Sequence, residues 1–244
     1  MNRIVTLSAA LLLCSSVAMA QGVNLYLNDC GAGSSVHTVT NACTSNSGIA
    51  FVAYGSCVVP RVTKQAFIGT MNVIDIQTSA ATIPDWWRAD DCRATGFALV
   101  TDATLGGSCP TIWDRVPPAG NNIFALPFVG GSARVRFLLG VVLYSYDAYD
   151  LVGDGTTELS VFKWIVLNQK SVGAGACGGC STGACIVLND VQIQGLYDHT
   201  VADFIDITNP LGSNSITYNT GAPVCAGSTP TQNRTWGALK SLYR

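Results

Sequence analysis

Apolar and polar residues alternate with a period of two through most of this 244-residue chain. That period puts successive side chains on opposite faces of a β-strand, so each strand turns one apolar face toward a core. Clusters of Gly, Pro, Asn and Asp, which are typical of turns, separate the runs. The runs cover residues 23–29, 49–59, 66–78, 134–149, 158–169, 185–196 and 214–219. They predict an all-β fold, an antiparallel β-sandwich of jelly-roll or immunoglobulin-like type.

Helical signals are few and short. Residues 83–93 are compatible with a single turn, and residues 235–244 with a short amphipathic helix or a last strand. No internal repeat and no long linker divides the chain. We therefore expect one β-sandwich domain over residues 21–244, with at most short helical turns.

The first twenty residues predict a secretory signal peptide. A weakly positive start at Arg3 precedes an apolar run over residues 4–13, and Ala18-Met19-Ala20 supplies the small-x-small pattern before a cleavage site. The apolar run is shorter than the ~20 residues that span a bilayer. We expect cleavage near Ala20 and a secreted, periplasmic or cell-surface protein that does not span the membrane.

Charge is sparse, with 11% charged residues and a formal net charge of −2. No basic patch with interleaved aromatic residues is present, which argues against nucleic-acid binding. A hydrophobic fraction of 48% favours a folded core over disorder. The partners we expect are further copies of this chain, other surface proteins, or glycans.

Cysteines are the second constraint on the fold. Of ten, Cys14 lies in the expected signal peptide, which leaves nine, and oxidising compartments favour disulfides. Cys57 lies inside an apolar strand and is expected to be a buried free thiol or to pair with another chain. The eight disulfide candidates are Cys30, Cys43, Cys92, Cys109, Cys177, Cys180, Cys185 and Cys225.

Spacing suggests a pairing without fixing it. Cys30 and Cys43 flank a polar loop, and Cys92 and Cys109 flank a strand followed by a Gly-Gly turn. The other four cysteines would then form two bridges among themselves, with Cys225 tied to the 177–185 cluster. Each bridge is expected to stabilise the fold by ~2–4 kcal/mol through restriction of the unfolded chain.

The cluster GACGGCSTGAC, residues 175–185, has other possible readings. A zinc site needs four ligands, and no histidine lies nearby. Haem attachment needs a histidine after Cys180, where Ser181 stands. A redox motif would open a helix, whereas Gly178-Gly179 and flanking strand-like residues predict a loop. Disulfides are the favoured interpretation.

Two further motifs suggest ligand sites. In a strand, one of Trp86 and Trp87 would face solvent and could stack on a sugar, although both could instead pack beneath a loop pinned by Cys92. Asp147, Asp150 and Asp154 lie in a Gly-bearing stretch that offers hard oxygen ligands for calcium. An ordinary Asp-Gly turn explains the last of these without metal. No other cofactor is expected.

No catalytic set stands out. Glu158 is the only glutamate beside fourteen aspartates, and glycosidases mostly use a pair of carboxylates. No Gly-x-Ser-x-Gly motif is present, and His37 and His199 give no triad pattern. We expect a protein that is not an enzyme. A hydrolase that uses aspartates is kept as an alternative.

Several blocks appear in a fixed order along the chain: the leader, LNDCG, PDWW…DDCR, CGGCSTGACIVLNDV and TWGALKSLYR. With its Cys-x-x-Cys-x4-Cys block and its Trp-Gly-x-x-Lys-x-x-Tyr-Arg end, the chain resembles a set of uncharacterised secreted bacterial proteins. The resemblance covers most of the mature chain and implies that Trp86, Trp87, Cys180 and Trp236 are framework residues. It implies no activity.

Together these patterns predict a secreted, non-catalytic structural or adhesive protein of the cell surface or extracellular space. Glycan binding of the carbohydrate-binding-module type is the first alternative, by analogy of fold alone.

Overall fold

The structure is a computed structural model, and it describes residues 22–30, 36–89, 91–101, 108–127, 133–197, 201–208, 210, 214–223 and 225. The expected signal peptide, His199 and the C-terminal block at 235–244 lie outside these residues. The described strands are β1 (Gly22–Leu27), β2 (Thr38–Val39), β3 (Ile49–Val58), β4 (Thr63–Phe67), β5 (Gly69–Thr78), β6 (Phe97–Val100), β7 (Gly120–Pro127), β8 (Arg134–Val142), β9 (Tyr149–Val152), β10 (Glu158–Leu167), β11 (Ala184–Tyr197), β12 (Val201–Ile207) and β13 (Ser215–Tyr218). Two single 3-10 turns, η1 (Asp85–Trp87) and η2 (Ser145–Asp147), are the helical segments among them.

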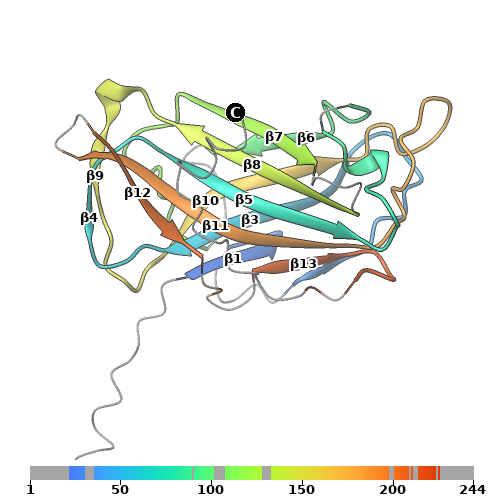
Figure 1. The fold of residues 1–244 in the computed structure, drawn as a ribbon, viewed down its shortest axis with the longest axis horizontal. Helices are drawn as coiled ribbons and strands as arrows, with labels where there is room; N and C mark the ends of the chain where they lie inside the picture. The colour runs from blue at the N-terminus through green and yellow to red at the C-terminus, as the bar shows by residue number, and fades with distance from the viewer. Residues whose placement is uncertain are drawn as a thin grey trace, which may run out of the picture.

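The strands form two large sheets and one small one (Figure 1). A four-stranded sheet has the order β1-β3-β10-β6, and a seven-stranded sheet has the order β2-β13-β11-β5-β8-β7 with β12 also paired to β11. A third sheet pairs β4 with β9. The described pairs are antiparallel apart from β13 and β2, which run parallel. The predicted all-β, sandwich-like fold is confirmed.

Alternation along the central strands builds the core. In β8, Val135, Phe137, Leu139 and Val141 are buried while the residues between them are more exposed. The Phe137 ring lies 5.4 Å from the ring of Trp164 in the facing sheet, measured between centroids. Residues from both large sheets therefore belong to one hydrophobic cluster, and burial of this apolar area is the main stabilising contribution.

One glycine is required by this packing. The ring of Phe162, on β10, lies 2.2 Å from the position that a Cβ on Gly55 of β3 would occupy. A side chain at residue 55 would displace that ring from the core.

Two long predicted strands are divided in the structure. The run at 66–78 is interrupted at Ile68, whose main-chain N–H donates to Gln194 and whose carbonyl accepts from Leu143. These bonds end β4 in one sheet and start β5 in another. The run at 134–149 ends as a strand at Val142, and η2 follows.

The eight candidate cysteines form four disulfides: Cys30–Cys109, Cys43–Cys180, Cys92–Cys177 and Cys185–Cys225. The pairings proposed from spacing, Cys30 with Cys43 and Cys92 with Cys109, are wrong. The expected bridge between Cys225 and the 177–185 cluster is found, and it is made by Cys185. The bridges join residues 79, 137, 85 and 40 positions apart, because the strand order brings distant segments together. Cys57 is unpaired and buried.

Four disulfides indicate that the protein resides in an oxidising compartment outside the cytoplasm. Among the described residues, no helix is long and apolar enough to cross a membrane.

Candidate functional site

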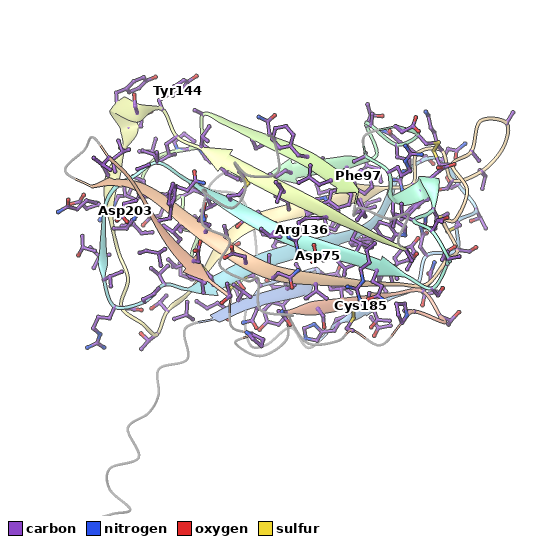
Figure 2. All side chains as sticks on the ribbon, in the orientation of Figure 1. Asp75, Phe97, Arg136, Tyr144, Cys185 and Asp203 are labelled. Carbon is purple, nitrogen blue, oxygen red and sulfur yellow. A yellow bond between two sulfur atoms is a disulfide. The ribbon has the colours of Figure 1, made fainter. Side chains whose placement is uncertain are left out.

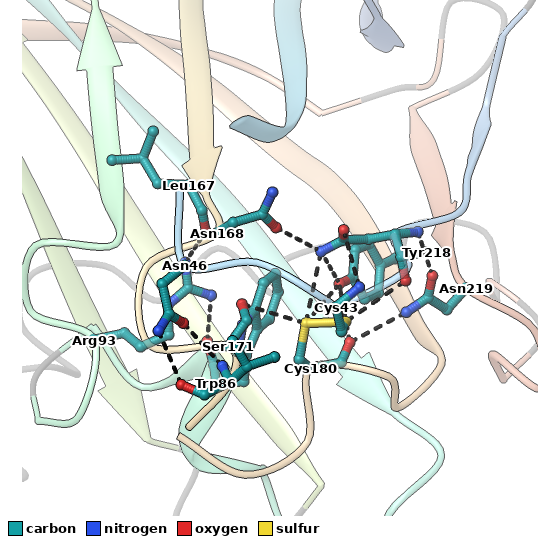
Figure 3. Close-up of a disulfide and its surroundings, with 12 residues drawn as sticks. Cys43, Asn46, Trp86, Arg93, Leu167, Asn168, Ser171, Cys180, Tyr218 and Asn219 are labelled. Atoms are coloured by element: carbon teal, nitrogen blue, oxygen red, sulfur yellow. Dashed lines mark hydrogen bonds between the residues drawn. A yellow bond between two sulfur atoms is a disulfide. The ribbon is translucent and has the colours of Figure 1, made fainter. Parts of the chain in front are cut away.

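Trp86 and Trp87 lie in the core rather than at the surface. Both side chains are fully buried, and both belong to η1. Their rings meet edge to face with centroids 4.8 Å apart. The Trp86 ring also stacks on Tyr218 at 5.3 Å, and Figure 3 labels these two residues beside the Cys43–Cys180 bridge. The sugar platform at Trp86 and Trp87 is therefore wrong, and the alternative reading, in which both rings pack inside near the bridged Cys92, is the one found. The platform assumed the alternation of a strand, and a 3-10 turn does not put neighbouring residues on opposite faces.

A buried cation completes this aromatic cluster. The guanidinium carbon of Arg93 lies 3.9 Å from the centroid of the Trp86 ring, a cation–π contact. Arg93 also donates to the carbonyl oxygens of Trp86 (3.1 Å), Gly96 (3.2 Å) and Leu167. Burial lowers its pKa to about 10, so it stays charged at neutral pH. Its donors serve the fold, and its side chain is almost fully buried.

The cysteine cluster belongs to the same end of the molecule. Cys177 forms a disulfide with Cys92, and Cys180 forms one with Cys43. The turn between Cys177 and Cys180 depends on Gly179, whose φ is 93°. A Cβ on Gly179 would lie 2.2 Å from Cβ of Pro84. With both sulfurs in disulfides, this loop holds no thiolate for zinc or redox chemistry.

The three aspartates predicted to bind calcium do not meet. The Asp154 carboxylate accepts from the Thr157 hydroxyl and from the N–H groups of Thr157 and Thr156, both at 2.7 Å. These bonds, that of the hydroxyl first, lower its pKa. Asp150 instead accepts from the Ala66 N–H at 3.0 Å. Within the described residues, the one group with converging metal-ligand atoms is Cys30, Cys109 and Glu158, and its two sulfurs are bonded to each other. The calcium prediction is wrong.

Glu158 and Cys57 are used within the fold. Oε1 of Glu158 accepts from Nδ2 of Asn24 at 2.8 Å and from the hydroxyl of Ser56. Burial raises the pKa of the Cys57 thiol, and the charge of Glu158 raises it further. A protonated, fully buried thiol is a poor nucleophile. Neither group is poised for chemistry on a substrate.

Asp190 is the most perturbed carboxyl in the described part of the chain. Burial raises its pKa to about 7, and the charge of Asp206 adds to the effect. A raised pKa is what a general acid needs. However, Asp190 is only 9% exposed, and its Oδ1 is buried with no hydrogen-bond partner among the described residues. A carboxyl so enclosed does not reach a substrate. Asp190 is therefore not a candidate catalytic residue for the hydrolase alternative.

A small cavity opens at the opposite end from η1. Its volume is about 140 Å³. The walls are residues 111–115 on one side and β9 on the other, closed by Leu159. Tyr149 forms one wall: its hydroxyl donates to the carbonyl of Ile112, its ring meets Phe67 edge on at 5.3 Å, and Arg115 lies 5.3 Å from its centroid. The rim carries the exposed side chains of Asp114, Arg115 and Asp150.

Two exposed tyrosines stand beside this cavity along the chain. Tyr144 and Tyr146 are 53% and 78% exposed, and their rings stack with centroids 5.1 Å apart and planes within 7°. Figure 2 places Tyr144 at the extremity of the molecule, far from Cys185. We call the region formed by η2, β9 and residues 111–115 the tyrosine end.

Sequence reasoning missed the tyrosine end. The pattern places residues 144 and 146 in a strand. However, Ser145 and Asp147 put polar side chains on the face that is apolar from Val135 to Leu143. That change from apolar to polar is the signal that could have revealed the turn. The meeting of Arg115 with Tyr149 has no sequence signal, because it depends on how distant segments pack.

Comparisons of this chain with protein-family models, with curated proteins and with solved structures found no match. The resemblance to secreted bacterial proteins stays a prediction.

Proposed function

We propose that this protein is a secreted, non-catalytic protein that acts as a structural or adhesive component at the cell surface or outside the cell. The observation that supports this most is the set of four disulfides, each of which joins segments at least 40 residues apart. Such cross-links keep a small protein folded where chaperones and reducing agents are absent. The signal peptide predicted before Gln21 fits the same location.

A non-catalytic role agrees with how the chain uses its reactive groups. Eight cysteines are paired and Cys57 is buried, Glu158 is bonded to neighbouring side chains, and Asp190 is enclosed. Enzymes instead place such groups beside a cleft, within hydrogen-bond reach of a substrate.

Self-association is one way such a protein can act, and β7 supports it. This strand carries no charged residue, and it is outermost in the seven-stranded sheet as described. Phe124 and Leu126 on it are 52% and 47% exposed. Natural sheets usually guard an edge with charges, prolines or bulges. β7 ends in Pro127, and Asn121 near its start donates to the Leu99 carbonyl of β6. The exposed apolar side chains of Phe124 and Leu126 between them are therefore the part that favours contact with another chain.

The test uses the protein exported into an oxidising compartment with its disulfides formed. We expect the purified protein to bind cells or extracellular polymer, or to self-associate in sedimentation velocity, and to hydrolyse no polysaccharide or ester substrate. Phe124→Lys should weaken any self-association and leave folding intact. Turnover of any substrate, abolished by Asp190→Asn, would overturn the proposal.

A further inference from the structure

We infer that the tyrosine end is a binding site for a neutral glycan, with the rings of Tyr144 and Tyr146 as the stacking surface and the adjacent cavity as the pocket for one sugar unit. This inference rests on the adhesive function proposed above and specifies its ligand. It moves the glycan hypothesis from Trp86 and Trp87, which are buried, to aromatic rings that solvent reaches.

The tyrosine pair suits a sugar because its rings are exposed and ordered by each other. The two rings stack in parallel with an offset, since their planes lie within 7° and their centroids are 5.1 Å apart. The outer faces remain available, and the electron-rich face of an aromatic ring attracts the C–H groups of a pyranose. Rings already held in place lose little conformational entropy when a ligand binds.

The cavity suits a single sugar unit in size. Its volume of about 140 Å³ corresponds to roughly ten water molecules on the same measure. Pockets for drug-sized ligands start at roughly twice that volume. The cavity opens to solvent between exposed residues on its two walls, Arg115 and Val152.

The cavity and the tyrosine pair lie within reach of one oligosaccharide. Tyr146 and Tyr149 are three residues apart, so their Cα atoms are separated by at most about 11 Å. A chain of two or three sugar units covers that distance. Tyr149 itself is fixed by its bond to Ile112 and its contact with Phe67, which keeps the cavity wall in place.

The charges at the rim favour a neutral ligand. Asp114 and Asp150 repel a phosphate or an acidic peptide, and Arg115 repels a metal ion. Carboxylates accept hydrogen bonds from sugar hydroxyls, and a guanidinium donates to hydroxyl and ring oxygens. A mixture of acceptors and donors around an apolar wall is the arrangement that a polyhydroxylated ring requires.

The experiment titrates the oxidised full protein with cellohexaose, mannohexaose, xylohexaose and chitohexaose by isothermal calorimetry. We expect at least one of them to bind with a Kd below about 1 mM. The double variant Tyr144→Ala/Tyr146→Ala should weaken binding by about tenfold or more, and Tyr146→Phe, which keeps the ring, should not. Asp114→Asn or Arg115→Ala should weaken it as well, since each removes a rim group.

Phe124→Ala is the matched control. Its ring is 52% exposed, like that of Tyr144, but lies on β7, so binding should be unchanged. Absence of binding by all four oligosaccharides, or binding indifferent to the tyrosine variants, would overturn the inference. Adhesion that persists while no oligosaccharide binds would leave the proposed function standing without this site. Cleavage of a bound oligosaccharide would support the site and overturn the non-catalytic function.

Discussion

The two ends of the sandwich are stabilised in different ways. The end that carries η1 has two disulfides, Cys43–Cys180 and Cys92–Cys177, and Trp86, Trp87 and Arg93 there are almost fully buried. Figure 3 shows the first of these bridges beside Trp86 and Arg93. We call this end of the sandwich the cross-linked end. Figure 1 shows η1 and η2 at opposite ends of the long axis.

At the tyrosine end, η2 and β9 carry none of the eight paired cysteines, whereas Cys109, bonded to Cys30, lies two residues before Thr111 of the cavity wall. Packing around Tyr149 and main-chain bonds hold this end together, while the rings of Tyr144 and Tyr146 face solvent. The contrast teaches that the exposed tyrosine rings lie away from the two bridges around Trp86, while a third bridge, Cys30–Cys109, borders the cavity segment. A rigid scaffold at one end can support a recognition surface at the other.

The largest effect that we predict comes from removing the bridge with the widest span. Cys43→Ala/Cys180→Ala opens a link between residues 137 positions apart. Because the Cys92–Cys177 bridge stays in place, the loop that the removed bridge closes through it is about 54 residues, and the chain-entropy relation gives a loss of about 4 kcal/mol in the free energy of unfolding. Guanidinium denaturation of the two proteins measures it.

Cys57→Ala is the control for this variant, because it changes a buried sulfur and leaves all four bridges intact. We expect it to cost about 1 kcal/mol. If the double variant lost no more free energy of unfolding than Cys57→Ala, the disulfides would not be what distinguishes the two ends.

The second prediction concerns the buried cation at the cross-linked end. Arg93→Met removes the guanidinium donors to three carbonyl oxygens, of which that of Gly96 keeps the Leu167 N–H, and removes the contact with Trp86; together these should cost about 3–4 kcal/mol. The stability of Arg93→Lys should fall between those of the wild-type protein and Arg93→Met, since an ammonium keeps the charge but not the planar guanidinium with its several donors. Thermal unfolding of both variants tests the order.

Arg88→Met is the comparison on the same segment. Arg88 pairs with Asp91 at 2.9 Å near the surface, where such pairs contribute up to about 1 kcal/mol. Equal losses for Arg88→Met and Arg93→Met would show that burial of Arg93 adds nothing to the cross-linked end.

Sequence predicted the framework of this molecule much better than its connections. Strands with one buried face, such as β5 and β8, show the alternation that their burial requires. β12, which runs along an exposed edge, was missed because little of it is buried and alternation is not imposed on it. Local patterns report burial, and burial is weakest at the edges of sheets.

The disulfide pairing and the tyrosine end could not be predicted from the sequence for another reason. Spacing favoured bridges between neighbours in sequence, whereas strand order decides which cysteines meet. The cavity depends on the bond from Tyr149 to Ile112, 37 residues apart, and no local pattern encodes it. Individual residues could be recognised as candidates, but their partners could not.

The third prediction concerns Asp190, on β11 between the two ends. Its pKa of about 7 in the folded protein lies above the ordinary aspartate value of 3.8. Between these values the folded state keeps a proton that the unfolded state has lost, so stability falls as pH rises, by up to about 1.4 kcal/mol per pH unit. Asp190→Asn should remove this contribution and be the more stable protein above pH 7.

Denaturation midpoints of both proteins between pH 4 and pH 8 measure the difference. Asp206→Asn should reduce the pH dependence without abolishing it, because burial is the larger cause of the shift and Asp206 the smaller. If the difference in denaturation midpoint between the wild-type protein and Asp190→Asn did not change with pH, the raised pKa of Asp190 would be contradicted.

The smallest effect is expected at the tyrosine end. Tyr144→Ser/Tyr146→Ser removes two rings that are mostly exposed, and such surface changes usually alter stability by no more than about 0.5 kcal/mol. Trp87→Ala at the cross-linked end removes one fully buried ring and should cost about 3–5 kcal/mol. Urea denaturation of the two variants compares the ends directly.

A loss well above 1 kcal/mol for the double tyrosine variant would mean that these rings hold η2 against β9. They would then be framework residues, as the tryptophans are, and their exposure would need no ligand to explain it. A small loss together with weakened oligosaccharide binding separates recognition from stability. That separation is expected if the disulfides at one end carry the stability, because the other end is then free to present side chains that contribute little to folding.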